Sequence, residues 1–234
     1  MCKQDGEILE VHSTPGGKVE SQGVLVFQAK SIALTEMRGY SIAESPLPVV
    51  VVNRKDAYAG RAFTLIHEFA HLMLRASGVC NLELGPNRTT REQRTEIFCN
   101  HVAGAVLVPK SRFLAEQSVR RHKGYSWKDE ELELVARNFS VSREVILRRA
   151  LILGLTDEEF YSLKREQLLR EYEVRTKGEG FIPPHTDVLS LSGKPFVKLV
   201  LNSYYSDKIT ASDVSEYLGF KLQHLEKINH AVGL

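Results

Sequence analysis

The chain of 234 residues lacks the features of a secreted or membrane protein. It has only three cysteines, and so odd and sparse a set does not make the disulfide framework of a small secreted domain. Residues 1–20 are polar and contain no apolar core of a secretory signal. The longest apolar runs, at 46–52 and 102–109, are far shorter than the ~20 residues that cross a bilayer. These absences predict a soluble, cytoplasmic protein with no membrane association.

An excess of charge of one sign is also missing. Lys and Arg number 31 against 29 Asp and Glu, which leaves a formal net charge of +2. Proteins whose main task is to hold nucleic-acid phosphates without sequence preference need a large basic excess, so this class is excluded. With 43% hydrophobic and 26% charged residues, the composition is that of a globular protein with a sizeable core.

Strand patterns come first in the chain and helix patterns follow. Short apolar runs predict strands at 23–28, 37–42 and 47–53. The third run holds four consecutive valines, which favour a sheet over a helix. Apolar residues at helical spacing then predict a buried helix at 61–75 and a second long helix at 90–107. The sequence therefore predicts an α+β fold.

The second half of the chain is predicted to be mostly helical, with a loop at 178–193. Helices are expected at 111–122, 127–138, 142–152, 157–175, 195–205, 211–218 and 221–230. The change from mixed elements to helices alone indicates a boundary near residue 125. We therefore predict a polar lead-in at 1–22, a core at 23–125 and a helical region at 126–234.

The segment His67-Glu68-Phe69-Ala70-His71 matches H-E-x-x-H inside the predicted helix at 61–75. Histidines four residues apart lie one above the other on a helical face, so both imidazoles can bind one zinc ion. Glu68 is rotated about 100° from His67, which places its carboxylate to reach a water on the metal as a general base. The alternative is a chance pattern, but three unpaired polar residues inside so apolar a helix would be costly. The motif therefore predicts a metal site.

A catalytic zinc needs a third protein ligand and one open position. Glu96 is the best candidate, because it shares a face of the second helix with Asn100. Asn100 could then hydrogen-bond a ligating histidine and fix its tautomer. Cys99, Glu92 and His101 compete with Glu96 for the third position. Zn²⁺ is the expected metal, although a site of two histidines and a glutamate also admits Mn²⁺.

These residues predict hydrolysis of peptide bonds. Zinc lowers the pKa of its bound water toward ~7 and polarises the scissile carbonyl. Glu68 takes the proton of this water and passes it to the leaving amine. Tyr40, Tyr58 and His101 are candidates for stabilising the oxyanion, and the sequence does not choose among them. The strand at 47–53, if exposed, could hold an extended peptide by backbone pairing.

Beyond this motif, an ordered set of segments resembles the ImmA/IrrE family of zinc metallopeptidases. The set comprises residues 23–28, 37–40, 48–53, 63–65, 96–103 and 107–109. Many unrelated peptidases share H-E-x-x-H alone, whereas the ordered set is much more specific. The core resemblance covers residues 23 to about 110. It implies a zincin-like fold in which a small sheet flanks two helices, with His67, His71 and Glu96 as ligands and Glu68 as the base.

The resemblance also implies a partner. Better-known members of the family cut a helix-turn-helix repressor of their own operon, and others are paired with such repressors in toxin–antitoxin-like modules. The expected substrate is therefore an Xre-type repressor or an antitoxin-like protein. Larger members often carry a helix-turn-helix domain in front of the core, and residues 1–22 are too few and too polar to form one. We expect the regulator to be a separate protein, or this chain to be a shortened version.

Two segments of the helical region, at 131–155 and 209–228, have a sequence pattern that resembles a helix-turn-helix. In the first of them, the second helix would carry Arg143, Arg148 and Arg149. The functional interpretation is binding to DNA or docking onto a DNA-binding partner. The plain interpretation is a set of helices that packs on the peptidase core.

The distribution of charge does not favour DNA binding by these helices. Residues 1–125 carry 16 basic and 12 acidic side chains, while residues 126–234 carry 15 basic and 17 acidic side chains. Contacts to phosphates need local cations, and the suggestive helices lie in the acidic half. Direct nucleic-acid binding is therefore not expected. The alternative function is a non-catalytic or DNA-binding regulatory protein of a toxin–antitoxin or mobile-element module.

Overall fold

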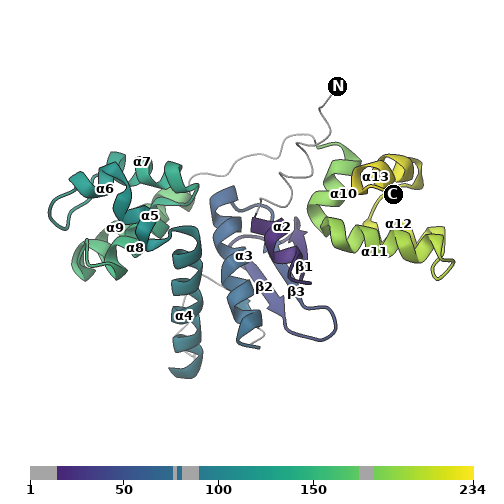
Figure 1. Ribbon diagram of the computed structural model, residues 1–234, viewed down its shortest axis with the longest axis horizontal. Helices are drawn as coiled ribbons and strands as arrows, with labels where there is room; N and C mark the ends of the chain where they lie inside the picture. The colour runs from purple at the N-terminus through teal and green to yellow at the C-terminus, as the bar shows by residue number, and fades with distance from the viewer. Residues whose placement is uncertain (1–14, 76–77, 81–89, 174–181) are drawn as a thin grey trace. The chain divides into compact units, whose positions relative to one another are not determined.

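The computed structural model describes residues 15–75, 78–80, 90–173 and 182–234, and these form an α+β fold as predicted (Figure 1). They fall into two compact units. The described parts of the first unit are 15–55, 72–75, 78–80 and 182–234, and those of the second are 56–71 and 90–173. The predicted boundary near residue 125 lies inside the second unit. No helix of the described residues is long and apolar enough to cross a membrane.

The first unit is built on a small mixed sheet. Its strands are β1 (Leu25–Ala29), β2 (Gly39–Ile42), β3 (Val49–Asn53) and β4 (Gly78–Cys80), in the order β1-β3-β2-β4. β1 pairs with β3 in parallel, while β2 runs antiparallel to both β3 and β4. The valines of β3 are mostly buried because a central strand of a covered sheet presents apolar side chains to both faces.

The position of β3 corrects one expectation from the sequence. The sequence predicts that the strand at 47–53, if exposed, could hold an extended peptide by backbone pairing. Leu25 and Val49 are partners on one side of β3, and Gly39 and Val52 are partners on the other. Because both edges of β3 are already paired, it cannot add a substrate strand, and that prediction is wrong.

The C-terminal helices of the first unit pack with this sheet. They are α10 (Pro184–Ser192), α11 (Lys194–Tyr205), α12 (Ala211–Leu218), the short 3₁₀ helix η1 (Leu222–His224) and α13 (Leu225–Val232). α10 contacts β1, and the rings of Phe27 and Phe196 meet edge to face with centroids 5.0 Å apart. The described part of the loop predicted at 178–193 is thus mainly the helix α10, which Pro184 begins because proline is tolerated in a first turn.

The predicted polar lead-in ends in a short helix, α2 (Pro15–Glu20), and residues 1–14 lie outside the described residues. Glu20 of α2 lies against Gly193, the residue between α10 and α11. A Cβ on Gly193 would lie 2.3 Å from Oε1 of Glu20 and 2.8 Å from the carbonyl oxygen of Val26, and its φ is +70°. Only glycine therefore fits at this joint, which brings the C-terminal helices close to the N-terminal part of the unit.

Glu20 makes the stability of this unit depend on pH. Burial raises the pKa of its carboxyl from 4.5 to about 7, although the charge of Lys194 partly opposes the shift. Because the folded chain holds the proton more tightly, this stabilisation is complete below pH 4.5 and is lost as pH rises through about 7. We expect the thermal midpoint to fall between about pH 5 and about pH 8, and Glu20→Gln to flatten this dependence. Thermal unfolding across that pH range measures the dependence, with Glu36→Gln as a control at an exposed position. If the thermal midpoint of Glu20→Gln falls with pH as steeply as that of the wild type, the prediction is contradicted.

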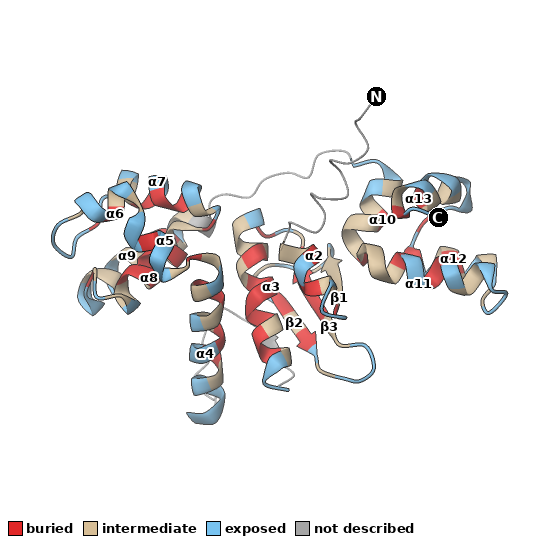
Figure 2. Cartoon of the chain, in the orientation of Figure 1, coloured by how far each residue is buried: buried red, intermediate tan, exposed pale blue. Residues whose placement is uncertain are grey.

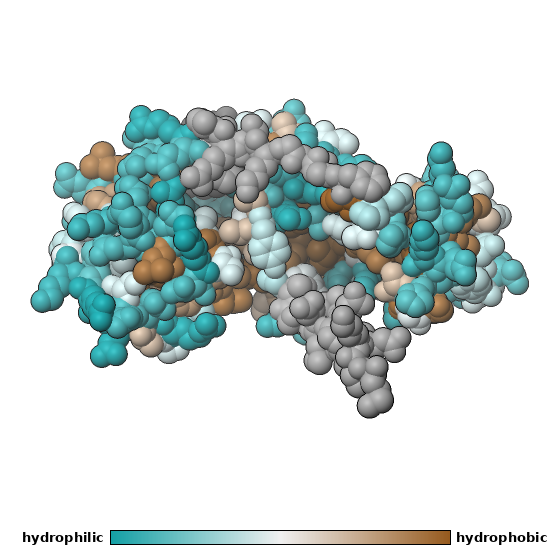
Figure 3. Space-filling model, turned by 90° about the horizontal axis from the view of Figure 1, so that it is seen from above, coloured by the Kyte–Doolittle hydropathy of each residue, from teal (hydrophilic) through white to brown (hydrophobic). Residues whose placement is uncertain are grey.

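The second unit consists of helices. They are α3 (Tyr58–Met73), whose last two residues are counted in the first unit, α4 (Thr90–Leu107), α5 (Lys110–Ala115), α6 (Gln117–Arg121), α7 (Asp129–Phe139), α8 (Arg143–Ile152) and α9 (Glu158–Glu173). A core of buried side chains joins the end of α4 to α5–α9, with Val108, Phe113, Leu132 and Ile146 fully buried. The face of this bundle seen in Figure 3 is largely hydrophilic, since the apolar side chains form the internal core.

Candidate metal centre

Helix α3 places the H-E-x-x-H motif in a buried position. The motif occupies the last two turns of the helix, which is buried along much of its length (Figure 2). His67, Glu68 and His71 are 1%, 0% and 4% exposed. Three ionisable side chains are therefore removed from water on one helix, which is costly unless they are hydrogen-bonded or bind a metal.

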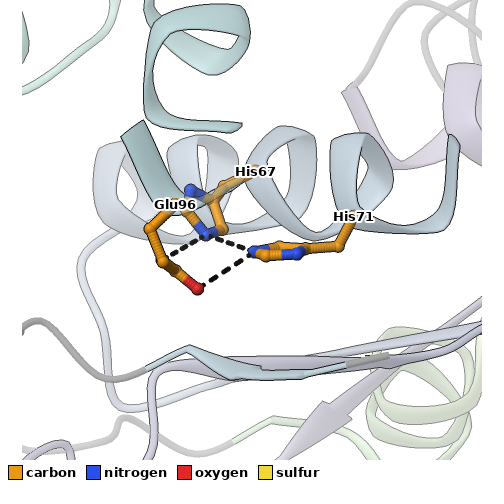
Figure 4. Close-up of side chains that lie close together, drawn as sticks. All are labelled: His67, His71 and Glu96. Carbon is orange, nitrogen blue, oxygen red and sulfur yellow. Dashed lines mark hydrogen bonds and ion pairs between the residues drawn. The ribbon is translucent and has the colours of Figure 1, made fainter. Parts of the chain in front are cut away.

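Glu96 of α4 meets the two histidines of α3 (Figure 4). The Nε2 atoms of His67 and His71 lie 3.1 Å apart. One carboxylate oxygen of Glu96 lies 3.4 Å from Nε2 of His67, and the other lies 3.3 Å from Nε2 of His71. Two ligands of a tetrahedral zinc ion, each about 2.0–2.1 Å from the metal, are about 3.3 Å apart. Both the donor types and their spacing therefore fit a divalent metal such as zinc.

The three side chains also shift one another's protonation. Burial by itself lowers the pKa of His71, but hydrogen bonds with Cys99 and Glu96 outweigh it and raise that pKa to about 10. Burial by itself raises the pKa of Glu96, but hydrogen bonds from His67 and His71 hold it well below its usual range. Without metal, His71 and Glu96 therefore form a charged pair at neutral pH, and a binding metal must displace the proton of His71.

Glu68 lies beside this cluster without being one of its members. The cluster of possible ligands consists of His67, His71 and Glu96 alone among the residues that the structure describes. The charge of Glu68 nevertheless contributes to the raised pKa of His71, so its carboxylate is close to the centre. A buried carboxylate near a metal site, outside the ligand set, is what a general base for water requires.

Comparison with known proteins agrees with this centre. The model of a peptidase family, described as the IrrE N-terminal-like domain, matches residues 19–151, which include all three side chains of the cluster. None of the curated proteins compared with the chain matches it. The chain belongs to the IrrE N-terminal-like peptidase family. The family is of metallopeptidase type, and the resemblance to ImmA/IrrE found in the sequence is confirmed.

The structure separates Glu96 from its three competitors for the third position. Glu92 and His101 are exposed on α4 and do not belong to the cluster. Cys99 is a fully buried free thiol that hydrogen-bonds His71, but its sulfur is not part of the cluster either. Of the four candidates, only Glu96 therefore lies with both histidines in the arrangement that a metal ligand needs.

The predicted role of Asn100 is absent from this structure. The sequence predicts that Asn100 hydrogen-bonds a ligating histidine. The Nδ1 atoms of His67 and His71 are buried, and neither has a hydrogen-bond partner within the described part of the chain. Asn100 therefore does not orient either ring, since Nε2 of both faces the cluster.

The three candidates for stabilising an oxyanion lie on three different elements. Tyr58 begins α3, nine residues before His67, and its exposed ring lies under the guanidinium of Arg61. Nine residues of helix span roughly 13 Å, so Tyr58 is too distant to share a substrate atom with the metal site. His101 is exposed on α4, and Tyr40 lies on β2 in the other compact unit. The role of an oxyanion donor therefore stays a prediction for Tyr40 and His101.

The first helix-turn-helix segment is formed by α7 and α8, but its arginines are engaged within the chain. Arg143 binds Asp129 at 3.2 Å and Glu171 at 2.5 Å. Arg148 binds Glu144 at 2.7 Å, and Nε of Arg149 donates to the carbonyl of Val108 at 2.9 Å. No residue from 143 to 151 is exposed. The helix expected to read DNA is therefore packed between its neighbours, which the sequence could not show.

Proposed function

We propose that the chain is a zinc-dependent endopeptidase that acts in the cytoplasm. The observation that carries this proposal is the buried cluster of His67, His71 and Glu96, whose donor atoms lie 3.1–3.4 Å apart, with Glu68 beside it. His67, His71 and Glu96 would hold the metal. When bound, zinc supplies a Lewis acid for the scissile carbonyl and for water.

Glu68 does the proton transfer in this proposal. Its carboxylate accepts the proton of the attacking water and donates it to the amine that leaves. The buried surroundings of α3 support this step, because they exclude bulk water and keep the carboxylate oriented. Asn100 is given no part in it, since it does not contact either histidine through Nδ1.

We further propose that the substrate is a helix-turn-helix repressor or an antitoxin-like partner, so that cleavage regulates transcription. Membership of the IrrE N-terminal-like family supports this choice. The alternative is a non-catalytic or DNA-binding regulator. The internal ion pairs of Arg143 and Arg148 speak against DNA binding through α8, because cations already paired with carboxylates contribute little to phosphate binding.

The test is cleavage of the proposed substrate, a helix-turn-helix repressor, by the purified chain. We expect the zinc-loaded protein to cut it into two fragments, a chelator to stop the reaction and added Zn²⁺ to restore it. Parallel reloading with Mn²⁺ shows which metal supports turnover. Cleavage that persists in chelator, or no cleavage with either metal, contradicts the proposal. A sequence-selective gel shift at physiological salt would instead support the DNA-binding alternative.

A further inference from the structure

The third side chain of the metal centre belongs to a helix whose position is set from its far end. His67 and His71 share α3, whereas Glu96 comes from α4. Among the described elements, α8 is the one that α4 contacts most. The described core residues at the end of α4 and on α8 belong to one apolar cluster, which includes Val108, Ile146 and Ala150. The placement of Glu96 therefore depends on how α4 is attached to α8.

A buried arginine makes this attachment. The side chain of Arg149 on α8 is 6% exposed, and its Nε donates to the carbonyl oxygen of Val108 at 2.9 Å. Val108 directly follows α4, and its own amide donates to the carbonyl of Gly104 in the last turn. The guanidinium therefore lies at the C-terminal end of α4, where the helix dipole is negative and free carbonyls need donors.

Arg149 differs from the other arginines of α8 in its partners. Arg143 and Arg148 pair with carboxylates, whereas no ion pair joins Arg149 to a carboxylate in the described ranges. Burial lowers the pKa of Arg149, as expected of a cation without a nearby anion. Burying a guanidinium without an anion costs free energy. What the buried guanidinium stabilises is the C-terminal end of α4, to which it donates a hydrogen bond. The match to the family model ends at residue 151, so it includes Arg149 and most of α8.

We propose, on the basis of the metal centre proposed above, that Arg149 is a positioning residue for Glu96. It acts through α4, which it fixes at the end opposite to the metal ligand. Glu96 precedes Val108 by twelve residues, or roughly 18 Å of helix. A tilt of about 5° at the anchor would move Glu96 by roughly 1.5 Å, while metal–ligand distances tolerate about 0.2 Å.

In this arrangement the helix-turn-helix-like pair α7 and α8 supports the metal site. Helix α8, the second helix of the pair, fixes the end of the ligand-bearing helix α4, and this takes the place of contact with a DNA groove.

The test measures metal affinity in three variants of the full-length chain. Arg149→Met keeps most of the side-chain volume but removes the donor, and we expect it to weaken Zn²⁺ binding about tenfold in a competition with a chromogenic chelator. Arg149→Lys restores a cationic donor and is expected to recover part of the affinity. The visible spectrum of the Co²⁺-loaded protein, which reports ligand geometry, should change in Arg149→Met.

The control is Val135→Ala, which removes buried volume from α7 while the donor of Arg149 and the three clustered side chains stay in place. It should lower the thermal midpoint while leaving Zn²⁺ affinity and the Co²⁺ spectrum unchanged. Equal affinity and an unchanged spectrum in Arg149→Met overturn the positioning role, as does an equal loss of affinity in Val135→Ala. If the wild type itself binds no metal, the proposed function fails. This outcome differs from the two results that overturn only the positioning role of Arg149.

Discussion

Glu68→Gln is expected to reduce the rate of peptide cleavage by about 10²–10⁴-fold while leaving metal binding intact. The amide has nearly the same shape as the carboxylate, so it fits the same buried space on α3. It cannot accept a proton from water, however, and the proton transfer is lost. Because Glu68 is not one of the three clustered side chains, the ligand set is unchanged. Single-turnover cleavage of the repressor and the zinc content of the purified variant measure both effects.

A matched control for this variant is Glu92→Gln, which makes the same chemical change at an exposed position of α4. It should cleave at the rate of the wild type. Equal rates for Glu68→Gln and the wild type would remove Glu68 from the mechanism. Loss of zinc from Glu68→Gln would instead show that this carboxylate takes part in holding the metal.

Glu96→Gln is expected to weaken zinc binding by more than about a hundredfold. Changing residues that merely orient a ligand costs 10–100-fold, so removing the charge of a ligand itself should exceed that range. The substitution also removes the carboxylate that raises the pKa of His71, so less proton competition remains and part of the loss is offset. Isothermal titration with Zn²⁺ at pH about 7.5 measures the net effect.

Cys99→Ser serves as the comparison for Glu96→Gln, because Cys99 is the other buried candidate on α4 and hydrogen-bonds His71. Its zinc affinity should stay within a few-fold of the wild type, since its sulfur lies outside the cluster. A larger loss in Cys99→Ser than in Glu96→Gln would reverse the assignment of the third ligand.

The local part of the metal centre could be predicted from the sequence. The spacing of His67 and His71 fixes both rings to one face, because a helix repeats every 3.6 residues and the apolar pattern already specifies a helix. The pairing of the two rings in the structure follows directly. Glu96 was favoured over Cys99 by its helical face, but periodicity alone did not decide between them. The rotation of α4 relative to α3 decides, and it depends on packing far along the chain.

The position of β3 shows a second limit. Four consecutive valines specify a buried strand, but they carry no information about which neighbours pair with it. β3 is central because β1 and β2 pair on its two sides, and β4 extends the sheet beyond β2. The same limit applies to the C-terminal helices, whose apolar patterns predict helices but not their contact with β1.

The sequence by itself determined that this chain has an α+β fold, that it resembles the ImmA/IrrE family, and that one helix carries two histidines and a glutamate for metal chemistry. These features are local, since they follow from spacing along the chain. Only the tertiary structure decided that Glu96 completes the cluster, that β3 has no free edge and that the arginines of α8 are engaged internally. Each of these three features depends on contacts between residues that are distant in sequence. Packing and charge pairing in the folded chain select those contacts.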